Sequence, residues 1–145
     1  MDEKDRLIIR ALKEDSSLSH REISKKTHIP LTTVHNRIKR MHKEKLIKKY
    51  TIQVDNEKLG LALAAYIMVT VNQQLAGRKI TQQEIAKHIK KFSCVDSVDI
   101  VTGQTDLLVK IRCASIRDLD TFITKDLRSI DGIDKTVSMI VLEEM

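Results

Sequence analysis

Residues 18–44 constrain the fold of this chain most, because they carry two short helical patterns on either side of a polar break. The first pattern begins at Ser19, which forms a capping box with Glu22, a combination typical of a helix N-terminus. The break contains Pro30, which cannot continue a helix from upstream but suits the start of the next one. The second pattern is apolar on one side and basic on the other. Such a pair of helices predicts a helix-turn-helix whose second helix enters a DNA groove.

The charge of the chain is concentrated around this segment. The whole formal charge of +6 lies within residues 1–60, because residues 61–145 hold equal numbers of basic and acidic side chains. Residues 19–50 alone hold ten basic and two acidic side chains. A basic half joined to a neutral half predicts that one part binds a polyanion while the other has a different task. Only 3% of the residues are aromatic, which favours double-stranded DNA over stacking on single-stranded RNA.

Further patterns divide the chain into two domains. Residues 2–14 predict a helix ahead of the two already described, and residues 46–54 (LIKKYTIQV) predict a short strand or wing beside them. Residues 55–60 form a polar connector that ends in a glycine. We therefore expect a winged helix-turn-helix DNA-binding domain over residues 1–54, a connector over 55–60 and a second domain over 61–145.

The second domain alternates strand and helix patterns. Apolar runs rich in β-branched residues predict four strands, and apolar residues at helical spacing predict two helices. A tight turn at residues 102–105 separates the two middle strands. The order β-α-β-β-α-β is that of a ferredoxin-like fold, so the expected fold class of the chain is α+β. The expected strands are 61–72, 95–101, 106–113 and 133–142, and the expected helices are 80–92 and 115–130.

Hydrogen-bonding chemistry suggests roles for the outer side of the helix that follows Pro30. Asn36 and Arg40 can each make paired hydrogen bonds to the edge of a purine base. Thr32 and Thr33 lie near the helix N-terminus, where hydroxyl groups suit phosphates or bases. Arg37 lies on the flank, so its guanidinium can pair with an acidic side chain of the same domain or contact DNA. The expected DNA-binding residues are Arg21, Thr32, Thr33, His35, Asn36, Arg37, Lys39, Arg40, Lys43, Lys48 and Lys49.

These segments, in this order and at this spacing, resemble the Lrp/AsnC (leucine-responsive, feast/famine) family of prokaryotic transcription regulators. The resemblance covers essentially the whole chain. Three residues depart from the family's pattern, since His28 and Lys45 stand where glycine is frequent and Thr105 stands where tyrosine is frequent. The matching residues are Asp5, Leu7, Ile8 and Leu12, the segments 19–24, 33–40 and 46–50, the pair Leu59 and Gly60, and a Gly-x-x-Asp turn within 102–108.

The resemblance implies a regulator that works as an oligomer. Its C-terminal domain would be the family's domain for regulation by amino-acid metabolites, and dimers would form through the sheet of that domain. These dimers would assemble further into tetramers or octamers, with an amino-acid effector bound between dimers near the Gly-x-x-Asp turn. The expected partners are double-stranded DNA, a second copy of the chain, an amino-acid effector and the transcription machinery. The expected effector-binding residues are Thr102, Gly103, Thr105, Asp106, Thr136 and Ser138.

Simpler roles remain open for some of these residues. Gly103 and Asp106 can serve hairpin geometry alone, through a positive φ angle and a local hydrogen bond. In the effector interpretation, the carboxylate of Asp106 suits an ammonium group, and backbone N–H groups of 102–105 suit a carboxylate. Thr136 and Ser138 can simply alternate with core residues along the last strand.

Other function classes have less support in the sequence. No P-loop, GxSxG, HExxH or Cys/His pair is present, so we expect no enzyme activity, no cofactor and no metal site. A general nucleic-acid or RNA-binding protein and an enzyme built on the second domain are the alternatives. Cys94 and Cys113 are interpreted as reduced apolar residues, and the lack of a membrane-spanning or signal segment predicts a cytoplasmic protein. Four histidines lie in the basic half at spacings that differ from a helical metal pair, namely His20, His28, His35 and His42.

Overall fold

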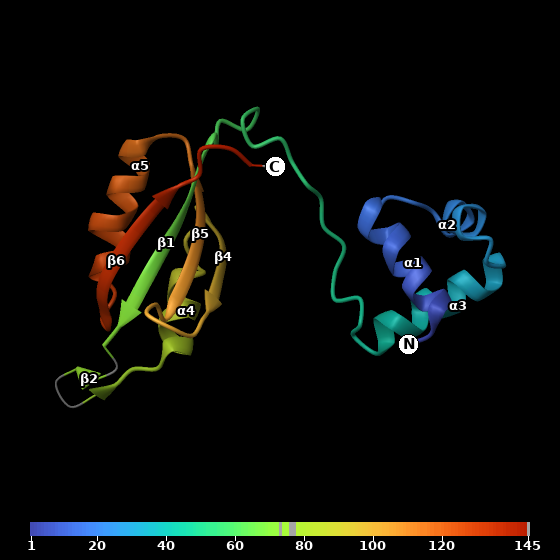
Figure 1. Cartoon of the computed structure of the whole chain (residues 1–145), viewed down its shortest axis with the longest axis horizontal. Helices are drawn as coiled ribbons and strands as arrows, with labels where there is room; N and C mark the ends of the chain where they lie inside the picture. The colour runs from blue at the N-terminus through green and yellow to red at the C-terminus, as the bar shows by residue number, and fades with distance from the viewer. Residues whose placement is uncertain (73, 76–77, 145) are drawn as a thin grey trace. The chain divides into compact units, whose positions relative to one another are not determined.

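Three helices form the N-terminal unit, Met1–Val54, in the computed structural model, which describes residues 1–72, 74–75 and 78–144 (Figure 1). They are α1 (Glu3–Glu14), α2 (His20–Thr27) and α3 (Leu31–Lys43). The predicted capping box of α2 is present, because the Ser19 hydroxyl accepts from the Glu22 N–H and the Glu22 carboxylate accepts from the Ser19 N–H. The core between the helices consists of the buried residues Ile8, Ala11, Ile23, Ile29, Val34, Ile38 and Met41.

The loops at the two ends of α3 use left-handed residues that carry a side chain. His28, which ends α2, has a φ angle of 54°, and Lys45, beyond α3, has a φ angle of 57°. Both stand at positions where glycine is frequent in the pattern that the chain resembles. Between α2 and α3, the Ser24 hydroxyl donates a 2.6 Å hydrogen bond to the carbonyl oxygen of the buried Ile29. The turn is therefore held by packing and hydrogen bonding despite the strain of the left-handed backbone.

Residues 46–54 contain no β-strand, so the prediction of a short strand there is wrong. A strand needs a neighbour whose N–H and C=O groups complete the ladder, and residues 1–54 form only helices and loops. Ile47 packs against the helical core, and the Ser16 hydroxyl donates to the carbonyl oxygen of Thr51 at 3.2 Å. Ile52 is 81% exposed, so the β-branched residues of this segment do not build a second layer.

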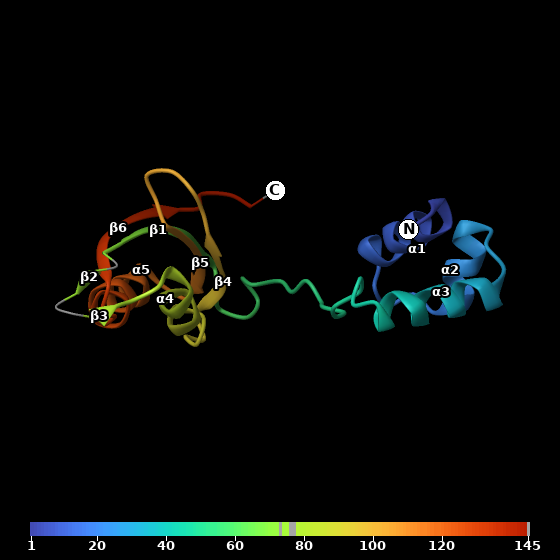
Figure 2. The ribbon, with the colours of Figure 1, turned by 90° about the horizontal axis from the view of Figure 1, so that it is seen from below.

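The C-terminal unit, Asp55–Met145, is built around a four-stranded antiparallel sheet with the strand order β4-β5-β1-β6. Helices α4 (Gln82–Ile89) and α5 (Ile116–Thr121) lie on the same face of this sheet (Figure 2). Beyond α5 the chain continues as a π-helical turn, Phe122–Asp126, and a 3₁₀ turn, Leu127–Ser129. The strands of the sheet are β1 (Leu63–Val71), β4 (Val95–Ile100), β5 (Leu107–Cys113) and β6 (Ile133–Ile140).

This order of elements confirms the predicted βαββαβ arrangement and the α+β fold class. A short hairpin of β2 (Gln74–Leu75) and β3 (Arg78–Lys79) precedes α4 and was not predicted. No helix in the described part of the chain has both the length and the apolar composition that crossing a bilayer requires.

The two faces of the sheet differ in what covers them. Ile67, Val109 and Ile111 are fully buried in the core that includes residues of α4 and α5. Residues that alternate with these point to the opposite face, which none of the helices formed by the described residues covers (Figure 2). We call this the open face, and its apolar residues, placed by the strand register, are Tyr66, Met68, Leu108, Val137 and Met139.

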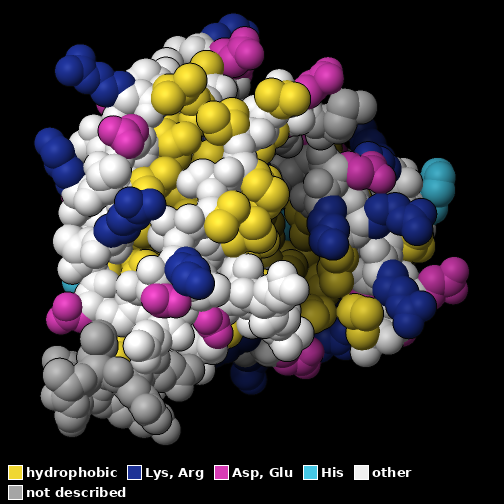
Figure 3. All heavy atoms as spheres, turned by 60° about the vertical axis from the view of Figure 1, so that its left-hand side comes forward, with side chains coloured by type: hydrophobic (Ala, Val, Ile, Leu, Met, Phe, Trp, Pro, Cys, Tyr) yellow, Lys and Arg dark blue, Asp and Glu magenta, His cyan; other side chains and the backbone are white. Residues whose placement is uncertain are grey.

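The open face is partly exposed and partly crossed by the end of the chain. Val137 is 55% and Met139 is 45% exposed, and Figure 3 shows hydrophobic side chains gathered on the surface of this unit. Glu144 accepts hydrogen bonds from Lys110 at 2.8 Å and from Arg112 at 2.7 Å. These two cations, Arg112 first, lower the pKa of Glu144 to about 2.

Candidate nucleic-acid interface

Helix α3 presents a fixed apolar side to the core and a polar side to solvent. Its apolar residues Val34, Ile38 and Met41 are buried against α1 and α2, as predicted. No side-chain hydrogen bond or ion pair within the described residues occupies Thr32, Asn36 or Lys39, all of which are exposed. Lys43, near the end of the helix, is exposed in the same way, while Thr33 is half-buried. Helix α3 is therefore rigidly seated and has unpaired hydrogen-bonding groups on its outer side.

The N-terminus of α3 adds backbone donors to this side. Its N-cap is Pro30, and no side chain caps the first turn. The first N–H groups of a helix without such a cap are free to bind an anion, and the helix dipole favours this. The hydroxyl groups of Thr32 and Thr33 lie in that same turn. The start of α3 can therefore accommodate a phosphate oxygen.

Two arginines of α3 are held by acidic residues at the start of α1, the N-cap Asp2 and Asp5 in the first turn. Nη1 of Arg37 donates to both carboxylate oxygens of Asp2 at 2.6 Å and to Asp5 at 2.8 Å. Nη2 of Arg40 donates to the other oxygen of Asp5 at 2.6 Å. Of the two interpretations of Arg37 left open by the sequence, the structure shows the intramolecular ion pair. Arg40 is 46% exposed and also lies 3.9 Å from Glu44, so part of its guanidinium still faces outward.

The charges in this cluster stabilise one another. Burial of the Asp5 side chain, which is 1% exposed, would raise its pKa, but the hydrogen bond from Arg37 and the charge of Arg40 outweigh burial and lower that pKa. Hydrogen bonds from Arg37 and from the Asp5 N–H lower the pKa of Asp2 to about 2. The two carboxylates in turn raise the pKa of Arg37. Asp2 and Asp5 also form the capping box of α1, so one cluster caps α1 and positions α3.

The remaining predicted contacts lie beside α3. Arg21 is exposed in the first turn of α2, and Lys48 and Lys49 are exposed in the segment after α3. His42, in the last turn of α3, lies 3.1 Å from the Tyr50 hydroxyl, which links that segment to the helix. His35 is exposed but is in contact with His20 of α2. The structure thus places the predicted residues on α2, α3 and the segment that follows, all within one unit.

Sequence reasoning did not identify the role of Asp5. It is the buried acidic residue among the described residues, and its neighbours in the three-dimensional structure come from 32 and 35 positions away. A signal was present, because Asp5 lies one helical turn before Ile8 on the buried side of α1. An acid at such a position has to find a cationic partner in the fold.

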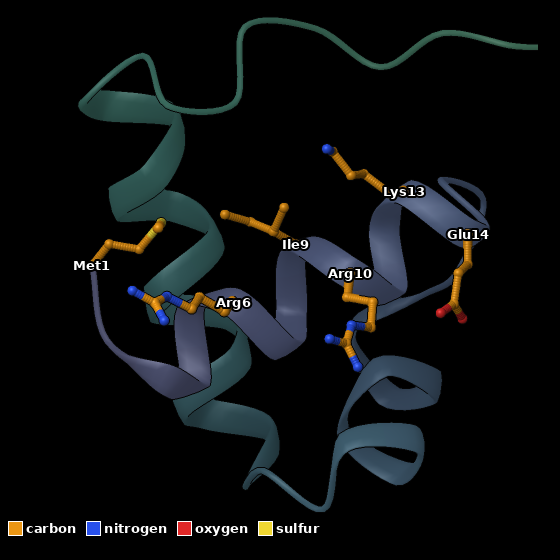
Figure 4. Close-up of a pocket in the computed structure, with 6 residues that line it drawn as sticks. All are labelled: Met1, Arg6, Ile9, Arg10, Lys13 and Glu14. Carbon is orange, nitrogen blue, oxygen red and sulfur yellow. The ribbon is translucent and has the colours of Figure 1, made fainter.

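A second basic surface lies on the outer side of α1. Figure 4 shows Arg6, Arg10 and Lys13 around an open hollow of about 370 Å³ that is completed by Met1, Ile9 and Glu14. Glu14 is already paired with Lys26 at 2.6 Å. None of these residues is among those expected from the sequence to contact DNA.

In the C-terminal unit, the predicted effector residues fall into two groups. Thr102, Gly103, Thr105 and Asp106 share the loop between β4 and β5, where Gly103 has a φ angle of 120°. Thr136 and Ser138 lie on β6, opposite Val69 and Ile67 of β1. The backbone N–H of Asp106 donates to the carbonyl oxygen of Val69, so Asp106 and Thr136 flank the same residue of β1 from its two sides.

The carboxylate of Asp106 has partners within the unit. It accepts a 2.8 Å hydrogen bond from the Val71 N–H and a 2.6 Å hydrogen bond from the side-chain amide of Gln82. These bonds tie the end of β1 and the start of α4 to the loop, a role that sequence reasoning missed. The Thr136 hydroxyl, by contrast, is buried without a hydrogen-bond partner among the described residues.

Comparison with known proteins agrees with this architecture. A family model described as Lrp/AsnC ligand binding domain matches residues 64–145, and one described as winged helix-turn-helix DNA-binding matches residues 1–48. An uncharacterized HTH-type transcriptional regulator from Pyrococcus furiosus is 35% identical over 97% of this chain and 91% of its own length.

Two solved structures are similar over the full chain. The structure of B. subtilis LrpC covers 100% of this chain and 96% of its own, with a TM-score of 0.85 and 26% identity. A transcriptional regulator from Neisseria meningitidis, solved as a complex with L-Met, covers 100% of this chain and 92% of its own, with a TM-score of 0.89 and 23% identity.

Proposed function

The chain belongs to the Lrp/AsnC family of transcriptional regulators, and on this premise we propose that α3 reads double-stranded DNA in a major groove. The observation that carries the proposal is the two-sided character of α3. Its apolar side is buried in the core, while Thr32, Asn36 and Lys39 face outward without partners among the described residues. Base reading needs such a helix, since its donors must be held in register with the base edges.

The residues of the interface divide by chemistry. Asn36 and the outward part of the Arg40 guanidinium suit purine edges. The basic and hydroxyl side chains around them suit phosphates, which fix the position of the helix without reading sequence. Arg37 is a positioning residue in this proposal, because its guanidinium holds Asp2 and Asp5. The proposed phosphate contacts are Arg21, Thr32, Thr33, Lys39, Lys43, Lys48 and Lys49, with His35 near the groove.

We assign residues 1–54 to DNA binding, residues 55–60 to a connector and residues 61–145 to effector binding and oligomerisation. The open face supports self-association, because it exposes Val137 and Met139 on a sheet face that no helix of the described segments covers. A dimer formed through this face would carry two copies of α3. A dimer of helix-turn-helix units binds half-sites about 34–36 Å apart, so we expect a near-palindromic operator.

The proposed effector is a small amino acid. The loop at residues 102–105 offers backbone N–H groups for its carboxylate, and the buried hydroxyl of Thr136 lacks a partner among the described residues. The L-Met complex of the similar Neisseria meningitidis regulator is in line with this class of ligand. The effector would act by favouring one assembly over another, and its coupling to DNA would be reciprocal.

In this proposal the protein performs no catalysis of its own and acts in the cytoplasm, where prokaryotic DNA is located. Its remaining partner is the transcription machinery. The position of the operator relative to the promoter then decides between activation and repression.

The experiment that tests this function is a selection of bound fragments from the source genome, followed by titration of the best site across salt concentrations. We expect an enriched near-palindromic motif and a steep fall of affinity with salt. Asn36→Ala should weaken the enrichment at one base pair of the motif, whereas Lys87→Ala, a change at an exposed lysine of α4, should leave the motif unchanged. A preference for RNA, or equal enrichment of all fragments, would contradict the proposal.

A further inference from the structure

Two histidines from different helices meet at the surface of the N-terminal unit. Nδ1 of His20, the first residue of α2, lies 3.2 Å from Nδ1 of His35 on α3. The ring centroids are 5.2 Å apart, and the ring planes are inclined by 69°. His20 is half-buried and His35 is exposed. The residues are 15 positions apart in the chain, so the pairing was hidden from an analysis of local spacing.

We propose that His20 and His35 form a binding site for a divalent transition-metal ion of the Zn²⁺ class, which links α2 to α3. Imidazole nitrogens bind Zn²⁺ at about 2.0–2.1 Å, so two ligands of a tetrahedral ion lie about 3.3–3.4 Å apart. The observed separation of 3.2 Å is close to this value. To ligate one ion, the two rings must rotate until both Nδ1 lone pairs point to it rather than along the line that joins the two atoms.

Binding of the ion changes the tautomer of one of the two rings. In the contact without metal, one Nδ1 donates its hydrogen and the other accepts it. With the ion bound, both Nδ1 lone pairs coordinate the ion, and each neutral ring carries its hydrogen on Nε2. In the ring that donated, the covalent Nδ1–H bond breaks with loss of its proton to water, and Nε2 takes up a proton from water, so the net proton count is unchanged.

The chemistry of the site selects the class of ion. Two imidazoles suit Zn²⁺, Cu²⁺ and Ni²⁺, whereas Mg²⁺ and Ca²⁺ require oxygen ligands. Among the described residues, no group of three or more His, Cys, Asp or Glu gathers around one point. The ion would therefore have two protein ligands, with water at its remaining positions. Arg21 follows His20 in the sequence, and Lys39 lies one helical turn after His35 on α3. Their positive charges repel cations that the two imidazoles do not bind directly.

Such an ion would act on the helix pair that carries the proposed DNA interface. Coordination by His20 and His35 would fix α3 relative to α2 close to Asn36. The Nδ1 atom of His35 would then no longer be available to contact DNA. This assignment stands independently of the DNA-reading role, because the site is built from two rings that face each other within one unit. A failure of DNA binding would leave the metal prediction untouched.

The test is a calorimetric titration of the full chain with ZnCl₂ in a buffer that does not bind metals. We expect one ion per chain at this site, and His20→Gln and His35→Gln should each weaken the affinity by about tenfold or more, at least the loss seen for second-shell changes. His42→Gln and His88→Gln are matched controls, since these histidines contact Tyr50 and Phe92 rather than another histidine. Both controls should bind Zn²⁺ like the original chain.

A second measurement needs no variant and so does not depend on how the variants fold. Long-range ¹H–¹⁵N spectra of the histidine rings should show that Zn²⁺ shifts the Nδ1 signals of His20 and His35 together, while MgCl₂ at the same concentration shifts neither. Equal Zn²⁺ affinity in all five proteins, or Nδ1 shifts at other histidines only, would overturn the assignment.

Discussion

Nη2 of Arg40 on α3 donates a 2.6 Å hydrogen bond to the carboxylate of Asp5 on α1. The second oxygen of that carboxylate accepts from Arg37 at 2.8 Å, and the Asp5 side chain is only 1% exposed. A buried carboxylate with two guanidinium partners holds the proposed recognition helix against the first helix. The orientation of α3 relative to α1 thus depends on a residue whose side chain is buried and makes no contact with DNA in the proposed interface.

Asp5→Asn should destabilise the N-terminal unit by about 2 kcal/mol, because the change removes a buried charge and leaves two guanidiniums with weaker acceptors. Urea unfolding followed by far-UV circular dichroism measures this difference. Asp55→Asn is the matched control, since Asp55 pairs with Lys58 at the surface, where both side chains are at least half exposed. An exposed pair contributes little, so equal effects of the two substitutions would contradict the role of Asp5.

Asn36→Ala should lower the affinity for the selected operator by about 1–3 kcal/mol and relax the preference at one base pair. Lys48→Ala should weaken all sequences alike and reduce the slope of affinity against salt. Both are measured by fluorescence anisotropy on the operator and on scrambled DNA. A uniform loss for Asn36→Ala across all sequences would exclude base reading by Asn36.

Arg40→Ala should show a similar loss of affinity of about 1–3 kcal/mol if Arg40 reads a base, but this change also removes the hydrogen bond to Asp5.

Acid should loosen the N-terminal unit through Asp2. Its pKa is lowered from 3.8 to about 2, mainly by hydrogen bonds from Arg37 and then from the Asp5 N–H. Because the folded value lies below the unfolded one, the stabilisation is complete above about pH 4 and is lost as the pH falls toward 2. We expect Asp2→Asn to reduce the pH dependence of stability in this window. The amide NMR signals of α1 and α3, followed from about pH 4 to about pH 2, measure this dependence. The same pH dependence in Asp2→Asn and in the original chain would contradict the role of Asp2.

Gly132→Ala should destabilise the C-terminal unit. A Cβ at this residue would lie 2.8 Å from Cδ1 of Ile85, which is itself buried, and the φ angle of 94° already disfavours a side chain. Gly60→Ala is the matched control, because Gly60 also has a positive φ, of 73°, but its Cβ would meet open space. Thermal unfolding should therefore show the larger loss for Gly132→Ala, by about 1–3 kcal/mol from the clash. The reverse order would contradict close packing at Gly132.

Val137→Glu should disrupt self-association, because it places a charge on the exposed part of the open face. Light scattering coupled to size exclusion would then show a smaller species than the original chain forms. Ile116→Glu serves as the comparison, since Ile116 is 66% exposed at the start of α5, on the helical side of the sheet. If only Ile116→Glu changed the mass, the proposed dimer face would be the wrong one.

The elements that follow from local patterns were predictable. The Ser19 and Glu22 capping box starts α2, and the stripe of Val34, Ile38 and Met41 orients α3, since each pattern spans at most two helical turns. The βαββαβ order also follows, because each strand and helix has its own apolar period. The strand expected at residues 46–54 fails for the opposite reason. β-propensity favours an extended chain, but a strand requires a partner that residues 1–54 do not supply.

Contacts between distant residues were beyond local reasoning. Asp5 finds Arg37 and Arg40 at separations of 32 and 35 residues, and Asp106 finds Gln82 at 24. The spacing of residues along the chain does not indicate which of these distant side chains come into contact. The sequence therefore indicated which side of α3 faces outward and left an intramolecular ion pair open for Arg37, but it did not indicate that Arg40 also binds Asp5.

His28 and Lys45 bracket α3 with left-handed backbone that a glycine would adopt without strain. Each residue lies outside the helix, and each helps to set where the helix begins or ends. A single substitution at either position would thus change how firmly α3 is seated while leaving every proposed contact with DNA in place. Substitutions at residues 28 and 45 can therefore adjust the affinity for DNA gradually in evolution, while the residues proposed to read the base sequence stay the same.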